Sequence, residues 1–255
     1  MNLFYCKDIT PNAFCTLDIE ESRHAVRVLR LREGDEIHVT DGKGNLYTCR
    51  IIDANDKACS LTPLPLSAAE RGVDTSDFPH PSPCEEGLGV RLHLAVAPTK
   101  NPSRMEWLVE KAVEIGVGEI TLLDCDHSER SFLKTDRLEK LAISAMKRSL
   151  HTVLPEIHPA VNLKDWLNSQ FSVLNSQLKF IAHCEADKPR TPLATALQPG
   201  HDVVVLIGPE GDFSEEEIAL ALDCGFQPVS LGPSRLRTET AALYAVTAFN
   251  LINDR

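Results

Sequence analysis

From residue 91 onward the chain alternates short apolar runs with longer amphipathic ones, and no other feature constrains its fold as strongly. The runs expected as strands are 91–98, 119–125, 179–186, 202–207 and 228–231. The runs expected as helices are 103–117, 135–150, 165–171, 214–225 and 241–252. Strands that alternate with helices predict an α/β fold with a mostly parallel sheet, covered by helices on both faces.

The first 66 residues follow a different pattern. Ile37 and Val39 alternate with polar residues, and the "DGKGN" at 41–45 is typical of a hairpin turn. Short strands of this kind predict a small β-barrel. Residues 67–89 carry three prolines within five residues and predict a linker. We therefore expect a β domain at 1–66, a linker at 67–89 and an α/β domain at 90–255.

The sequence argues against a secreted protein, a membrane-spanning protein and a protein stabilised by a structural metal site. The N-terminus shows no signal-peptide pattern, and the strongest apolar run, "VVVLI" at 203–207, falls well below the ~20 residues of a membrane span. The eight cysteines are scattered without a C-x-x-C pair. We expect a cytoplasmic protein with reduced thiols, no metal site and no membrane partner.

One basic stretch stands out in a chain whose net charge is −11. Its cationic side chains are Arg23, His24, Arg27, Arg30 and Arg32. On a helix, Arg23, Arg27 and Arg30 share a face, with Val26 and Leu29 directed toward a core. Two interpretations remain open: an RNA-binding surface, or a solvated face balanced by nearby glutamates.

Two strand-to-helix junctions carry the polar residues expected at the carboxyl edge of a parallel sheet, where ligands bind. In the first, Ser214 and Glu217 form a capping-box pattern after "GPEG". In the second, "LGPSRLRTETAA", Thr238 or Thr240 can cap the helix, but helix capping does not explain Arg235 and Arg237. An ion pair of Arg237 with a nearby glutamate, Glu239 or Glu210, remains an alternative to a functional role.

The junctions lack the phosphate-binding patterns G-x-G-x-x-G and G-x-x-x-x-G-K-[ST]. A nucleoside cofactor would therefore have to be one without a phosphate, which S-adenosylmethionine is.

Several blocks together resemble one known family. The pair "LIGPEGDFSEEE" and "LGPSRLRTETAA" is similar to the signature of SPOUT methyltransferases with a trefoil knot, and more closely to the ribosomal RNA small subunit methyltransferase E family. "HAVRVLRLREGDEIHVTDGKG" resembles its N-terminal PUA-like RNA-binding domain, and "KNPSRMEWLVEKAVEIGV" and "SER" at 128–130 match further blocks. The chain departs from the family pattern at Asn2, at 147–151, where "KRSLH" replaces E-Q-x-x-R, and at Asp212, where glycine is commoner.

The resemblance implies S-adenosylmethionine-dependent methylation of N3 of a uridine in 16S ribosomal RNA by a homodimer, acting on the RNA or the assembled small subunit. The implied cofactor residues are His183, Leu206, Gly208, Pro209, Glu210, Gly211, Leu231, Gly232, Leu236, Arg237, Thr238, Glu239, Thr240 and Ala241. Arg237 is the candidate catalytic residue, with Arg130 and Arg104 as alternates. The RNA-binding residues would be Arg23, His24, Arg27, Arg30 and Arg32. The alternative is a non-catalytic RNA-binding module that dimerises through its α/β domain, with contact through Leu243, Val246, Phe249 and Leu251.

Overall fold

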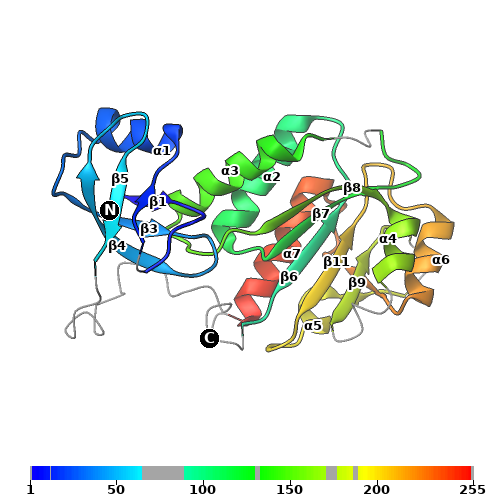
Figure 1. Cartoon of the computed structure of the whole chain (residues 1–255). Coiled ribbons are helices and arrows are strands. Elements are labelled where there is room, and N and C mark those ends of the chain that lie inside the picture. The colour runs from blue at the N-terminus through cyan, green and yellow to red at the C-terminus, as the bar shows by residue number, and fades with distance from the viewer. Residues whose placement is uncertain are drawn as a thin grey trace. The chain divides into compact units, whose positions relative to one another are not determined.

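The computed structural model describes residues 2–11, 13–64, 89–129, 133–170, 177–185 and 189–253 (Figure 1). The chain forms two compact units. Unit 1 comprises Met1–Glu85 and Ile143–Leu154, and unit 2 comprises Glu86–Ala142 and Pro155–Arg255. Most of the predicted linker, residues 67–88, lies outside the described residues.

Unit 1 is built on a curled sheet of five short strands in the order β1-β3-β4-β5-β2. These strands are β1 (Leu3–Tyr5), β2 (Cys15–Thr16), β3 (Glu36–Thr40), β4 (Leu46–Asp53) and β5 (Ser60–Pro63). β1 pairs with β3 in parallel and the other pairs are antiparallel. Ile37 and Val39 point into the core beside Phe4 and Ile51, so the predicted alternation in β3 is confirmed.

A segment distant in sequence completes unit 1. Thr40 Oγ1 donates to the Thr152 carbonyl at 2.9 Å, and Leu154 N donates to the Gly42 carbonyl at 2.8 Å. Gly42 has a φ of 75°, and a Cβ there would come within 2.8 Å of the Tyr5 ring. Only glycine combines that backbone angle with such a close approach. The sequence pattern does not predict that 143–154 packs with the β unit.

The arginine-rich stretch is not one continuous helix, so the predicted common face is wrong. α1 covers Ile19–Arg23, with Asp18 as its N-cap, and one π-helical turn follows at His24–Val28. Arg30 then takes a left-handed φ of 58°. A π turn and a left-handed residue both break the 100° spacing on which the shared face depended. Val26 and Leu29 do pack on the core, as predicted.

Unit 2 is built on a seven-stranded, wholly parallel sheet in the order β10-β12-β9-β11-β6-β7-β8. Its strands are β6 (Leu92–Val96), β7 (Glu119–Asp124), β8 (Glu156–Asn162), β9 (Leu178–Ala182), β10 (Thr191–Pro192), β11 (Val203–Ile207) and β12 (Gln227–Ser230). The central strands β6 and β11 are buried along their whole length. The predicted α/β class with a small β domain is confirmed.

Helices cover both faces of this sheet (Figure 1). The helices of unit 2 are α2 (Pro102–Ile115), α4 (Leu163–Gln170), α5 (Leu193–Ala196), α6 (Glu215–Asp223) and α7 (Thr238–Asn253). α3 (Thr135–Arg148) begins in unit 2, and its residues from Ile143 onward belong to unit 1. α4 and α6 pack on the face that carries Ile181, Val204 and Leu206, while α2 and α7 pack against each other. The trefoil knot that the resemblance implies stays a prediction.

No helix within the described residues combines the length and the apolar character that a membrane span requires.

Candidate functional site

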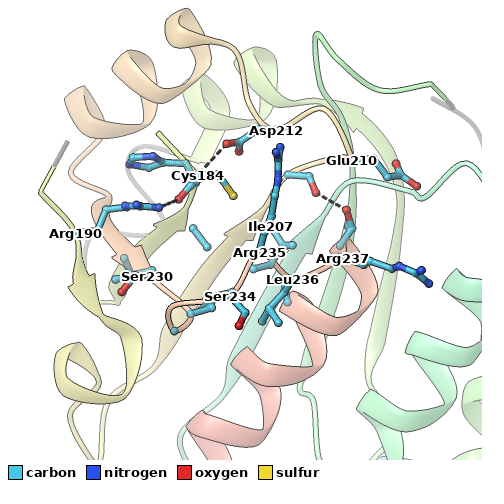
Figure 2. Close-up of a pocket in the computed structure, with 18 of the residues that line it drawn as sticks. Cys184, Arg190, Ile207, Glu210, Asp212, Ser230, Ser234, Arg235, Leu236 and Arg237 are labelled. Atoms are coloured by element: carbon cyan, nitrogen blue, oxygen red, sulfur yellow. Dashed lines mark hydrogen bonds between the residues drawn. The ribbon is translucent and has the colours of Figure 1, made fainter. Parts of the chain in front are cut away.

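A cavity of about 320 Å³ lies at the carboxyl ends of three neighbouring strands of unit 2 (Figure 2). β9, β11 and β12 each end at this cavity, and the residues that follow them form its walls. The lining residues are Ala182, His183, Cys184, Arg190, Ile207, Gly208, Pro209, Glu210, Asp212, Val229, Ser230, Leu231, Gly232, Ser234, Arg235, Leu236, Arg237, Thr238 and Ala241. Its volume is at the lower end of the range for small-molecule sites, and its position is the one where parallel sheets bind ligands.

A hydrogen bond joins the two junctions that the sequence singles out. Thr238 Oγ1 donates to the Gly208 carbonyl at 3.1 Å, and both residues are buried. Thr238 is the first residue of α7, which therefore begins three residues earlier than predicted. The hydroxyl fixes the start of α7 against the end of β11, and this contact defines one wall of the pocket.

The loop between β12 and α7 turns at Gly232, whose φ is 104°. A Cβ at Gly232 would meet no protein atom within 4 Å, so the constraint on this position is its left-handed backbone. Arg235 and Arg237 follow in the same loop. Figure 2 shows the side chain of Arg235 rising beside Ile207, whereas the side chain of Arg237 extends away from the other labelled residues.

Neither of these two guanidinium groups forms an ion pair within the part of the chain that the structure describes, and both are exposed. The proposed partners are engaged elsewhere. Glu239 is buried with its Oε1 3.7 Å from Arg104 Nε, and Glu210 Oε1 accepts from the backbone N–H of Lys100 at 3.1 Å. The ion-pair interpretation of Arg237 is therefore wrong, and the loop presents two cations to an incoming anion.

Asp212 lines the pocket on the side of the loop that follows β11. Its backbone is left-handed, with a φ of 66°, which aspartate tolerates better than most residues. Its Oδ2 accepts a hydrogen bond from Cys184 N at 2.7 Å, and its Oδ1 accepts one from Phe213 N at 2.9 Å. The carboxylate thus ties the loop after β11 to the end of β9, which a glycine at this position could not do.

Behind the pocket, the capping box predicted at the start of α6 is confirmed. Ser214 Oγ accepts from Glu217 N at 3.2 Å, and Glu217 Oε2 accepts from Ser214 N at 2.8 Å. Ser214 Oγ also donates to Asp126 Oδ2, and Lys164 Nζ lies 3.0 Å from the same oxygen. The hydrogen bond from Ser214 makes the largest contribution, and that from Lys164 the next, to lowering the pKa of Asp126 below its ordinary value.

The structure brings together ten of the fourteen cofactor residues named from the sequence. Those that line the cavity are His183, Gly208, Pro209, Glu210, Leu231, Gly232, Leu236, Arg237, Thr238 and Ala241. Leu206, Gly211, Glu239 and Thr240 are not among its lining residues. Of the two alternates to Arg237, Arg104 lies outside the lining and Arg130 lies outside the described residues.

Sequence reasoning missed Arg190. Its Nη1 donates to the carbonyl of His183, the residue just after β9, and so supports the wall opposite α7 (Figure 2). Arg190 comes just before the two-residue strand β10, which has no recognisable pattern of its own. Ser230 and Ser234 were also missed, and only their place beside Gly232 could have suggested them.

Comparisons with known proteins agree with this fold. Residues 86–250 match a family described as "RNA methyltransferase domain", and residues 17–64 match "RNA methyltransferase PUA domain". Ribosomal RNA small subunit methyltransferase E of Buchnera aphidicola is 28% identical over 94% of this chain and 89% of its own length.

Two solved structures extend the likeness over the whole chain. A probable rRNA-methyltransferase from Porphyromonas gingivalis is 37% identical, with a TM-score of 0.83 over 100% of this chain and 99% of its own. A ribosomal RNA small subunit methyltransferase E from Neisseria gonorrhoeae bound to S-adenosyl methionine is 25% identical, with a TM-score of 0.76 over 99% and 98%. The chain therefore belongs to the ribosomal RNA small subunit methyltransferase E family of RNA methyltransferases.

Proposed function

We propose that this chain methylates N3 of a uridine in 16S ribosomal RNA, with S-adenosylmethionine as the methyl donor. The observation that carries the proposal is the cavity formed by the ends of β9, β11 and β12, in a chain whose relatives include a methyltransferase bound to that cofactor. The position of the methyl group and the identity of the RNA follow from the family resemblance of the sequence.

The cavity suits this cofactor chemically. Apolar side chains such as Ile207 and Leu236 offer a surface for an adenine ring, and the start of α7 at Thr238 favours a carboxylate. The space beside Gly232 is open, so a ligand can approach the backbone there. The residues that would hold the cofactor are His183, Gly208, Pro209, Leu231, Gly232, Leu236, Thr238 and Ala241. When bound, S-adenosylmethionine supplies a methyl group carried on a positively charged sulfur.

The two free arginines of the loop have the charge that the RNA side of the reaction needs. Uracil N3 must lose its proton before or during methylation, and a nearby cation stabilises the resulting negative charge. Arg237 was the candidate from the sequence, and the structure adds Arg235, which lines the same cavity. We assign this role to the pair. The variants Arg235→Gln and Arg237→Gln separate them, because loss of the catalytic charge lowers kcat at saturating RNA.

We further propose that the working enzyme is a homodimer that uses only part of the apolar stripe expected on α7. Val246 and Phe249 are buried in the chain's own core. Tyr244 and Leu251, which are 39% and 72% exposed, remain available on that helix, as does Trp107 on α2 at 45%. Light scattering at micromolar concentration tests the proposal, and a stable monomer refutes it.

The experiment that tests the function most cheaply is calorimetry with S-adenosylmethionine. Micromolar binding to the purified chain supports the enzyme. Absence of binding, together with retained affinity for ribosomal RNA, supports the non-catalytic RNA-binding module instead.

A further inference from the structure

Several cysteine side chains meet in the core of unit 1, and two of them are in contact. Cys15, Cys49 and Cys59 are buried there, and Cys6 packs against the same core. The thiols of Cys6 and Cys15 form a hydrogen bond with each other. None of these four cysteines is among the residues that line the cofactor cavity, so methyl transfer does not account for the pair.

The pair lies where the two edges of the curled sheet meet. β1 and β2 are the first and last strands in the order of that sheet. Cys6 directly follows β1, and Cys15 is the first residue of β2. Cys6 Sγ also lies 4.0 Å from the carbonyl oxygen of Thr16, the other residue of β2. A covalent bond between the two sulfur atoms would therefore join the edges of the sheet.

Backbone hydrogen bonds hold Cys6 in position. Its N–H donates to the Thr40 carbonyl at 3.0 Å, and its own carbonyl accepts from Ile9 N at 3.2 Å. The turn formed in this way directs the N–H groups of Asp8 and Ile9 toward the Cys6 sulfur, which accepts hydrogen bonds from both. N–H donors that point at a sulfur atom stabilise its thiolate form.

These contacts give the two thiols different chemistry. The hydrogen bond with Cys15, and then those from the backbone of Asp8 and Ile9, lower the pKa of Cys6 to about 7, against the opposing effects of burial and the Asp8 carboxylate. The hydrogen bond with Cys6, together with burial, raises the pKa of Cys15. At neutral pH about half of Cys6 is thiolate, the form that reacts with oxidants.

Access to solvent differs between the two thiols in the same direction. Cys6 is half-buried, so a small oxidant can reach its sulfur, whereas Cys15 is only 7% exposed. The accessible thiol is thus the one that carries the negative charge, and its protonated partner lies directly behind it. Redox-sensitive cysteine pairs have this arrangement of an attacking and a resolving thiol.

We propose that Cys6 and Cys15 form a peroxide-sensitive pair whose disulfide joins β1 to β2. The Cys6 thiolate attacks one oxygen of hydrogen peroxide and the O–O bond breaks, which leaves a sulfenic acid on Cys6. The hydroxide released takes up the proton that Cys6 had lost and becomes water. The Cys15 sulfur then attacks the Cys6 sulfur, the S–O bond breaks, and the leaving hydroxyl takes the Cys15 proton as a second water. Two thiols and one peroxide therefore give one disulfide and two waters.

The test treats the reduced, full-length protein with hydrogen peroxide at neutral pH, alkylates the remaining thiols in denaturant and maps the peptides by mass spectrometry. The parent should lose two free thiols and yield a peptide cross-linked between Cys6 and Cys15, and dithiothreitol should restore both thiols. Cys184 serves as an internal comparison, because it is exposed and lies in unit 2. If Cys184 is oxidised while Cys6 keeps its thiol, exposure alone decides reactivity and the proposal is overturned.

Two variants separate the roles of the thiols. Cys15→Ala should leave Cys6 as a sulfenic acid that dimedone traps, and should slow alkylation of reduced Cys6 at neutral pH roughly tenfold, because the donor to its thiolate is gone. Cys49→Ala is the matched control, since Cys49 is fully buried in the same core and its loss leaves the pair intact. It should form the disulfide as the parent does. A parent that forms no disulfide, or one that links Cys6 to another cysteine, contradicts the proposal.

The structural consequence is measured by amide hydrogen exchange. Because the disulfide ties both edges of the sheet together, oxidation of the parent should slow exchange in β1 and β2. Peroxide should not change the exchange of these strands in Cys6→Ser. A cross-linked parent whose β1 and β2 exchange as fast as in the reduced protein would overturn the claim that the disulfide joins the two edges.

Discussion

The hydroxyl of Thr238 lies 3.1 Å from the carbonyl oxygen of Gly208, although the two residues are 30 positions apart. This hydrogen bond fixes the first turn of α7 against the end of β11, so the two loops that wall the cavity cannot move independently. Asp212 makes the equivalent link on the other side, from the same loop to Cys184 at the end of β9.

Replacing Thr238 by valine should weaken cofactor binding without unfolding the chain. Valine has nearly the same shape but leaves the buried Gly208 carbonyl without its donor, at a cost of about 1–3 kcal/mol. We expect roughly a tenfold loss of S-adenosylmethionine affinity by calorimetry. Thr240→Val in the same turn is the control, because Thr240 is exposed and does not line the cavity. Equal effects of the two variants would contradict the role of the hydrogen bond.

Gly232→Val should abolish S-adenosylmethionine binding and leave RNA affinity nearly unchanged. The substitution strains a φ of 104° and fills the open space beside the backbone. Gly225→Val provides the matched control, since Gly225 also has a positive φ, 87°, and open space around it but lies outside the cavity. If calorimetry shows the same cofactor affinity for Gly232→Val as for the parent, the site is misplaced.

The exposed arginines of the 23–32 stretch should carry RNA affinity independently of the cofactor. Arg23→Gln and Arg30→Gln should each reduce the salt slope of RNA binding by about 0.7–0.9 if each side chain neutralises one phosphate. Arg27→Gln should have a smaller effect, because Arg27 already pairs with Asp56. The measurement is a salt titration of RNA binding for the three single variants. Unchanged slopes would mean that these arginines form a solvated surface only.

His93 should make the stability of unit 2 depend on pH. Burial, with a smaller contribution from His158, lowers the pKa of His93 to about 4, against an ordinary value of 6.5. Between these values the unfolded chain binds a proton that the folded chain does not, so stability is full above pH 6.5 and falls as pH drops toward 4. The loss reaches up to about 3 kcal/mol.

The control for this effect is His93→Gln, which keeps a polar partner for Thr121 Oγ1, now 2.8 Å from His93 Nε2. Urea unfolding of parent and variant is measured from pH 7 to pH 4. Burial also raises the pKa of Glu119, but Glu119 is present in both proteins, so the difference between their stabilities reports the histidine alone. If the free energy of unfolding depends on pH in the same way in the two proteins, His93 is not the source of the pH dependence.

The sequence predicted the parts of this fold that depend on local periodicity. The capping box at Ser214 and the strand–helix alternation after residue 91 are short-range patterns, and the structure contains both. β8 and β10 were missed because "PEIHPAVN" and "TP" alternate too weakly to be recognised. The prediction that the arginines of 23–30 share one helix face failed at Arg30, which has a left-handed backbone. Arginine rarely adopts this conformation, so nothing in the sequence indicated it.

The candidate site was recognised through its glycines and threonines and missed where tertiary contacts alone define it. Gly232 and Thr238 stand in recognisable junctions, whereas Arg190 reaches the pocket wall only through the folded position of β10. The packing of 143–154 into unit 1 likewise depends on hydrogen bonds more than 100 residues apart, such as that from Thr40 to Thr152. No local pattern encodes such contacts.

The central claim is tested most directly by mass spectrometry of small-subunit ribosomal RNA from cells with and without this protein. The account predicts one N3-methyluridine that is present in the parent strain and absent from the deletion strain. Purified protein with S-adenosylmethionine should restore it, and the Gly232→Val variant should not. Identical methylation in the two strains, or a methyl group restored at an atom other than uridine N3, would contradict the account.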